Sequence, residues 1–175
     1  AYYTGKRAYD IIQSQIRIVD NRTIEGYRII TGWAKMRKVY FRAEFSRPFK
    51  AHMLMDGSRN VGQSEVINGR VLRSALSFDA NESQELTVKV AISPVDSHGA
   101  RLNMKAEASS WDFGYYVQAA HDAWQKELAC IDIEGSDEQK TIFYTGLYHV
   151  LMQPNTMSDV DGRYMTTNYE IKQMP

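Results

Sequence analysis

The residues best suited to chemistry lie near the end of the chain, in the run Ser-Asp-Val-Asp-Gly at positions 158–162. Asp159 and Asp161 are separated by one residue, and carboxylates at this spacing can converge on a hard cation such as Ca²⁺. Asp-x-Asp-Gly is also part of an EF-hand loop, but the remaining acidic ligands of such a loop are missing. Alternatively, the run is a turn in which Gly162 has a positive φ and Asp159 bonds local amides. We favour the turn.

Aromatic residues offer a second kind of chemistry. Trp33, Tyr27 and Tyr40 could stack on sugar rings, because an aromatic face suits the apolar face of a pyranose. The alternative, which we favour, is that they fill a hydrophobic core and its interface with helices. The four histidines are scattered, and none has a second histidine at the spacing of a zinc site. The residues alone therefore predict no complete active site and no metal site.

Composition limits the classes of protein to which the chain can belong. A length of 175 residues suits one ordinary domain, or one domain and part of another. The 21 basic residues balance the 21 acidic ones, so no overall field favours nucleic acid or an anionic membrane. No stretch approaches the roughly 20 apolar residues of a membrane span. We therefore expect neither a nucleic-acid partner nor a membrane span.

Before Ser109 the hydrophobic period is two, which is typical of strands. Apolar and polar residues alternate clearly at 39–46 and 86–92. Weaker strands are predicted between turn signals, at 16–19, 27–33, 49–55 and 71–78. Short strands without intervening helices predict an antiparallel β-sandwich that extends to about residue 108.

After Ser109 the hydrophobic period becomes that of a helix. Asp112 can cap a helix over 112–128, and the Ser-x-x-Gln run that starts at Ser136 predicts a capping box for a second helix over 137–153. Pro154 forbids continuation of the second helix. Each apolar stripe needs a partner, so the helices should expose part of an apolar face, through residues such as Phe143, Leu147 or Leu151.

Eight short sequence motifs, spread in order along nearly the whole chain, together carry a resemblance to a known family. They are TIEGYR (23–28), GWAK (32–35), YFRAEFSRPF (40–49), KVAISPV (89–95), GARLN (99–103), AWQKEL (123–128), KTIFYTGLYH (140–149) and QPNTMSDVDG (153–162). They closely resemble glycoside hydrolase family 92. Members of that family are calcium-dependent exo-α-mannosidases, typically secreted or surface enzymes of bacteria. The tyrosine-rich helix and its acidic loop are the most specific part of the resemblance.

The resemblance implies a mainly β fold with helices, in which an antiparallel β-sandwich is followed by a linker helix and the first helix of a truncated (α/α)6 barrel. On that pattern, residues 1–108 form a sandwich that is incomplete at its N-terminus. Residues 109–135 form the linker helix and connector, and residues 136–175 form the first helix and acidic loop of the catalytic helical domain. The general acid, the general base and most calcium ligands are expected beyond Pro175. Asp159, Asp161 and Trp33 are the only candidate substrate-binding residues that we name.

The implied function is hydrolysis of α-1,2-linked mannose by single-displacement inversion. We expect the parent enzyme to use calcium, to act on mannose-containing glycans and to be periplasmic, extracellular or attached to the bacterial surface. The expected partner of this chain is the remainder of the helical barrel. The chain alone should be inactive and should bind no calcium. Two other functions remain open, a stand-alone carbohydrate-binding sandwich module and a purely structural sandwich.

Overall fold

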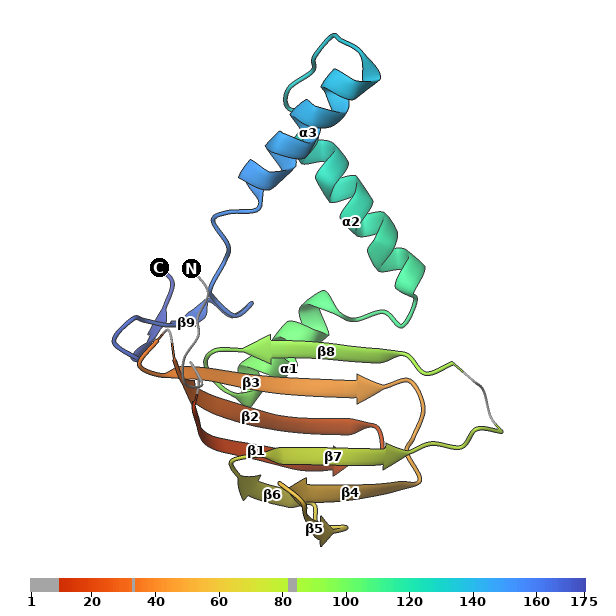
Figure 1. Cartoon of the computed structure of the whole chain (residues 1–175), viewed down its shortest axis with the longest axis vertical. Helices are drawn as coiled ribbons and strands as arrows, with labels where there is room; N and C mark the ends of the chain where they lie inside the picture. The colour runs from red at the N-terminus through yellow and green to blue at the C-terminus, as the bar shows by residue number, and fades with distance from the viewer. Residues whose placement is uncertain (1–9, 33, 82–84) are drawn as a thin grey trace. The chain divides into compact units, whose positions relative to one another are not determined.

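The computed structural model describes residues 10–32, 34–81 and 85–175. The chain divides into two compact units (Figure 1). The first comprises Ala1–Trp111 and Met157–Pro175, and the second comprises Asp112–Thr156. The C-terminal segment therefore returns to the unit that contains the sheets.

Two antiparallel sheets form most of the first unit (Figure 1). The larger sheet has five strands in the order β6 (Val66–Gly69), β1 (Asp10–Asp20), β2 (Thr23–Thr31), β3 (Arg37–Phe45) and β8 (Val88–Ser93). The smaller sheet has three, in the order β5 (Arg59–Gly62), β4 (Ala51–Asp56) and β7 (Leu72–Ser77). The mainly β, antiparallel fold predicted from the alternating pattern is thus confirmed.

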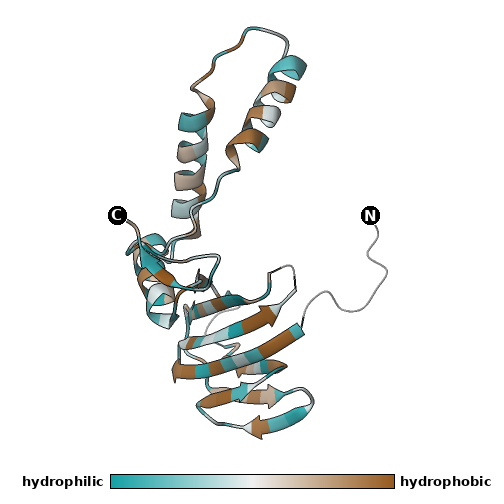
Figure 2. Cartoon of the chain, turned by 90° about the vertical axis from the view of Figure 1, so that its left-hand side faces the viewer, coloured by the Kyte–Doolittle hydropathy of each residue, from teal (hydrophilic) through white to brown (hydrophobic). Residues whose placement is uncertain are grey.

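The hydrophobic core lies between the two sheets. Ile16 and Ile24 of the larger sheet belong to the same buried cluster as Leu54 and Leu72 of the smaller one, and Leu54 is completely buried. Figure 2 shows apolar and polar residues alternating along the strands, as a sheet with one buried face requires. This alternation gives the larger sheet an inner face toward the core and an outer face away from it.

The helix α1 (Ser97–Glu107) was not predicted from the sequence, because the predicted β-sandwich extends to about residue 108 and includes these residues. The helix begins after Asp96, whose side chain accepts a hydrogen bond from the backbone N–H of Gly99 at 2.6 Å. Ala100 and Met104, one turn apart, are buried, and the helix packs on β8 and β3. Gly99 has low helix propensity and the buried stripe is short, so the helical period was obscured.

The C-terminal segment forms a small hairpin of β9 (Arg163–Met165) and β10 (Ile171–Gln173). The turn between these strands contacts the loop that joins β2 to β3. The hydroxyl oxygen of Tyr169 accepts a hydrogen bond from the backbone N–H of Met36 at 3.0 Å. The hairpin was not predicted from the sequence.

The second unit consists of the helices α2 (Phe113–Leu128) and α3 (Asp137–Leu151), which confirms the two predicted helices. The predicted capping box is present, because Ser136 and Gln139 exchange side-chain and backbone hydrogen bonds. Neither helix has a buried residue. The expected exposure of an apolar face is confirmed for Leu151, which is 38% exposed, whereas Phe143 and Leu147 are half-buried. No helix among the described residues is long and apolar enough to cross a membrane.

Candidate functional site

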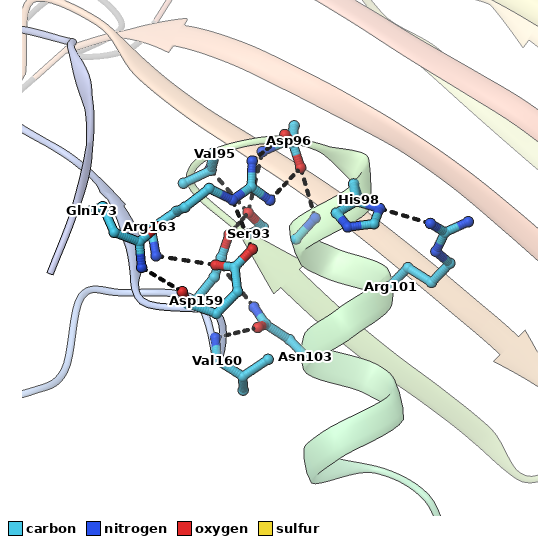
Figure 3. A network of polar contacts seen from close by, with 12 residues as sticks. Ser93, Val95, Asp96, His98, Arg101, Asn103, Asp159, Val160, Arg163 and Gln173 are labelled. Atoms are coloured by element: carbon cyan, nitrogen blue, oxygen red, sulfur yellow. Dashed lines mark hydrogen bonds and ion pairs between the residues drawn. The ribbon is translucent and has the colours of Figure 1, made fainter.

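The acidic loop meets the end of β8 and the helix α1 in a polar network centred on Asp159 (Figure 3). The Asp159 side chain is buried, with 3% of its surface exposed. Its Oδ2 accepts a hydrogen bond from the Ser93 hydroxyl at 2.7 Å, and its Oδ1 accepts one from Asn103 Nδ2 at 2.8 Å. A buried carboxylate needs such donors to offset its loss of water.

Two elements of regular structure position these donors. Ser93 is the last residue of β8, and its hydroxyl oxygen accepts a hydrogen bond from the Val95 backbone N–H at 2.9 Å. Asn103 lies on α1, donates also to the Ile92 carbonyl, and accepts from the Val160 N–H at 2.9 Å. The acidic loop is therefore held through the side chain of Asp159 and through the backbone N–H of Val160.

Gly99 leaves the space in which the Asp159 carboxylate sits. A Cβ at position 99 would lie 2.1 Å from Asp159 Oδ2 and 2.6 Å from Ser93 Oγ. Both distances are far below van der Waals contact, so a larger residue would displace the carboxylate. The close approach of α1 to the loop thus depends on glycine at this position.

A second, more exposed cluster is built around Arg163, the first residue of β9. Its guanidinium donates to both carboxylate oxygens of Asp96, at 2.7 and 3.2 Å, and its Nε donates to Asp161 Oδ2 at 2.7 Å. The hydrogen bonds from Arg163 hold the pKa of Asp96 and the pKa of Asp161 below the ordinary value. The same two carboxylates raise the pKa of Arg163. The cluster ties the C-terminal hairpin to the cap of α1.

These lowered pKa values predict a stability that weakens in acid. A carboxyl group whose pKa is lower in the folded chain stabilises it above the unfolded pKa and ceases to do so as the pH falls through the folded pKa. The melting temperature should therefore fall once the pH drops below 3.8, the ordinary pKa of both carboxyls. Thermal melts of the wild type and Arg163→Met at neutral and acid pH test this.

The melting temperatures of the wild type and Arg163→Met should converge as the pH falls, because protonation removes the ion pairs that the variant lacks at every pH. The matched control is Arg73→Met on β7, which should follow the wild type throughout. A constant difference between the wild type and Arg163→Met at all pH values would contradict the assignment.

The structure supports the turn interpretation of the acidic loop. Gly162 has a φ of 80°, and its N–H donates to the Asp159 carbonyl at 2.9 Å. The side-chain roles differ from the expectation, however. It is Asp161 that accepts from a local amide, the N–H of Arg163 at 3.0 Å, while Asp159 reaches residues far away in the sequence. Trp33, the third candidate, lies outside the described residues.

The residues of this network do not fit a calcium site. Both oxygens of Asp159 face N–H or O–H donors, and Asp161 is paired with a guanidinium that would repel a cation. Calcium prefers oxygen ligands, of which it takes six to eight. Within the described ranges, no group of three or more His, Cys, Asp or Glu residues could hold a metal ion. We therefore derive no chemical step through calcium from these side chains.

Sequence reasoning missed Ser93, Asn103 and Arg163. Ser93 and Asn103 lie 66 and 56 residues from Asp159, and no local pattern links positions so far apart. Arg163 directly follows the Asp-Gly turn, and this proximity was the one available signal. These hydrogen bonds fix the acidic loop in place. Because the Asp159 and Asp161 carboxylates accept them, neither carboxylate is arranged to transfer a proton to or from a substrate.

Comparison with known families gives two matches along the chain. The model of the glycosyl hydrolase family 92 N-terminal domain matches residues 3–93, and that of the family 92 catalytic domain matches residues 99–174. Ser93 is the last residue of the first match, whereas Asn103 and Asp159 lie in the second. The network therefore joins the two matched regions. No curated protein sequence matches this chain.

Solved structures are similar over almost the entire chain. The family GH92 α-mannosidase BT3965 of Bacteroides thetaiotaomicron is 31% identical with a TM-score of 0.85, and the match covers 93% of this chain and 23% of that one. Its complex with mannoimidazole is likewise 31% identical, with a TM-score of 0.86 and coverage of 93% and 22%. The inverting mannosidase BT2199 of Bacteroides thetaiotaomicron VPI-5482, 24% identical with a TM-score of 0.81 and coverage of 92% and 23%, shares the fold. The chain thus spans less than a quarter of the length of these structures.

Proposed function

Since this chain belongs to glycoside hydrolase family 92, we propose that it is part of an α-mannosidase that releases mannose from glycans. The observation that carries the proposal is the match to BT3965, which combines 31% identity with similarity over 93% of the chain. The complex of BT3965 with mannoimidazole supports a mannose-like ligand. The activity belongs to a protein longer than the 175 residues, because the chain spans 23% of the BT3965 structure.

In more detail, we propose that the complete enzyme cleaves terminal α-1,2-linked mannose with inversion, outside the bacterial cytoplasm and with calcium as its cofactor. Inversion requires one carboxylic acid to protonate the glycosidic oxygen and one carboxylate to activate water on the opposite face of the sugar. These groups stand about 6.5–9.5 Å apart in inverting enzymes. Family resemblance supports these details, and we propose that the acid, the base and the calcium ligands belong to other parts of the complete enzyme.

In such an enzyme, the acidic loop of this chain has a structural role and not a catalytic one. Asp159 and Asp161 already accept hydrogen bonds from Ser93, Asn103 and Arg163, so neither is free to act as acid or base. What they do is fix the loop that follows α3 against the end of β8. In the complete enzyme, the position of the helical segment that follows would depend on this anchoring.

The proposal is tested by following hydrolysis of α-1,2-linked mannobiose with proton NMR, using the complete enzyme that contains this chain. Inversion predicts that β-mannose appears first and then equilibrates with the α anomer. Parallel reactions with α-1,3- and α-1,6-linked mannobiose test the linkage, and reactions with a chelator test the need for calcium. Initial release of α-mannose would contradict inversion, and no release from any α-mannoside would contradict the function.

A further inference from the structure

Tyr27 and Tyr40 form a ring pair on the outer face of the larger sheet. They are register partners on β2 and β3, with ring centroids 5.6 Å apart and planes inclined by 50°. Ile24 and Gly26, on alternate positions of β2, are buried. Side chains alternate across a strand, so Tyr27 lies on the opposite face and is only half-buried. The pair therefore lies outside the core between the two sheets. The helix α1 packs on β3 and β8, so the other part of the favoured interpretation, an interface with a helix, stays a prediction.

The pair belongs to a row of polar and aromatic side chains that crosses the sheet. Gln15 on β1 is the register partner of Tyr27, and Asn68 on β6 is the register partner of Gln15. Gln15 Nε2 donates to Asn68 Oδ1 at 2.9 Å, which leaves the Gln15 carbonyl and the Asn68 amino group at the surface. Neighbouring strands lie about 4.8 Å apart, so the row from Asn68 to Tyr40 extends about 14 Å.

Charged groups stand at the β8 end of this row. Ser93 is the register partner of Tyr40. The ion pair of Asp96 and Arg163 lies beside Ser93 (Figure 3). Burial raises the pKa of Tyr40, and the neighbouring Tyr27 and Asp96 raise it further. The Asp96 side chain is 39% exposed, and among the described residues its Oδ2 accepts one hydrogen bond, from Arg163. An oxygen of this kind has room for a second donor.

The two phenol hydroxyls are also available. Over the part of the chain that the structure describes, neither Tyr27 nor Tyr40 makes a hydrogen bond through its hydroxyl group, although the two rings contact each other. A hydroxyl group can donate one hydrogen bond and accept two. The row thus combines apolar ring surface with donors and acceptors that are not hydrogen-bonded to any group in residues 10–32, 34–81 and 85–175.

We propose that the row formed by Asn68, Gln15, Tyr27 and Tyr40, with Asp96 at its end, binds mannose-containing glycans. Tyrosine rings provide a surface for the apolar face of a pyranose, and the amides, phenols and carboxylate match its hydroxyl groups. The row is long enough to contact more than one sugar ring. The choice of mannose, rather than another neutral sugar, rests on the proposed function.

The test is a titration of the ¹⁵N-labelled 175-residue chain with α-1,2-linked mannobiose, followed by amide chemical shifts. We expect saturable shifts on β1, β2 and β3 with a Kd of about 1 mM, because half-buried rings offer a flexible ligand little contact surface. Tyr27→Ala and Tyr40→Ala should each weaken binding about tenfold, which corresponds to about 1.4 kcal/mol. Tyr27→Phe, which keeps the ring and the fold, should weaken binding less than Tyr27→Ala.

The matched control is Tyr115→Ala on α2. Tyr115 is 57% exposed and pairs with Tyr116 at a centroid distance of 5.1 Å, so it belongs to a tyrosine pair of the second unit. This variant should bind as the wild type does. Gln15→Ala changes the row without removing a ring and should also weaken binding, which tests the assignment if Tyr27→Ala or Tyr40→Ala fails to fold.

The inference is overturned if mannobiose causes no saturable shifts, or if folded Tyr27→Ala and Tyr40→Ala variants bind as the wild type does. Binding of cellobiose without binding of mannobiose would overturn it as well. Its failure is distinguishable from failure of the proposed function. Binding is read from chemical shifts of this chain, whereas hydrolysis is read from mannose released by the complete enzyme.

Discussion

Replacement of Asp159 by alanine should lower the free energy of unfolding of the sheet-containing unit by about 3 kcal/mol and its melting temperature by roughly 10 °C. The carboxylate is 3% exposed and accepts hydrogen bonds from Ser93 and Asn103. Hydrogen bonds to a charged group contribute about 1.5–3 kcal/mol each, and removal of the acceptor leaves both donors buried without it. Circular dichroism melts of the wild type and Asp159→Ala measure the change.

Asp132→Ala is the control, since Asp132 is an exposed aspartate in the second unit. It should melt within about 1 °C of the wild type, because surface substitutions usually change stability by less than about 0.5 kcal/mol. Equal melting temperatures for Asp159→Ala and the wild type would contradict the anchoring role of the loop.

A double-mutant cycle with Gly99 tests the same contact by its geometry. Gly99→Ala alone should destabilise the chain by about 1–3 kcal/mol, because its Cβ would lie 2.1 Å from Asp159 Oδ2. In the Asp159→Ala background the carboxylate is gone, so the second substitution should cost less than it does in the wild type. Strictly additive effects would show that the two residues do not meet as the structure indicates.

The 175-residue chain should release no mannose from α-1,2-linked mannobiose, with or without calcium, under conditions in which the complete enzyme releases it. Acid–base help contributes typically 10²–10⁴-fold, and positioning and charge stabilisation contribute more, all from groups assembled in one pocket. Asp159 and Asp161 are held by Ser93, Asn103 and Arg163, so they supply neither the acid nor the base. Mannose is quantified with a coupled enzymatic assay.

The complete enzyme serves as the positive control, and the chain carrying Asp159→Asn and Asp161→Asn identifies the source of any activity observed. Calcium-dependent release by the wild-type chain that is lost in this variant would show that the two aspartates are catalytic. That result would overturn both the inactivity of the chain and our account of the acidic loop.

Local patterns in the sequence were sufficient to predict those strands and helices that are long enough to show their hydrophobic period at least twice. The alternation at 39–46 and 86–92 correctly predicted β3 and most of β8, because successive side chains of a strand point to opposite faces. It did not predict burial in β8, where Val90 and Ile92 are 61% and 60% exposed. The capping box at Ser136 correctly predicted the start of α3, since the donors it satisfies lie within the same turn. Residue runs also sufficed to recognise the family, which the comparisons confirm.

The short elements could not be predicted in the same way. The helix α1 has one buried turn and the hairpin β9–β10 has strands of three residues each, so neither repeats its period often enough to be recognised. Their conformations depend on distant contacts, such as those between Arg163 and Asp96 and between Tyr169 and Met36. Tertiary contacts commonly decide the structure of such weakly patterned segments.

The sequence by itself determined the turn at 158–162, since Gly162 and its acidic neighbours specify a turn through bonds along the chain. Only the tertiary structure decided that Asp159 is a buried anchor, because its donors come from β8 and α1, 56 to 66 residues away. The same holds for Tyr27 and Tyr40. Their composition suits either a core or a surface, and only the register of β2 and β3 places them on the outer face. Hydrogen bonds and burial act through space, and a linear pattern records only what is near in the chain.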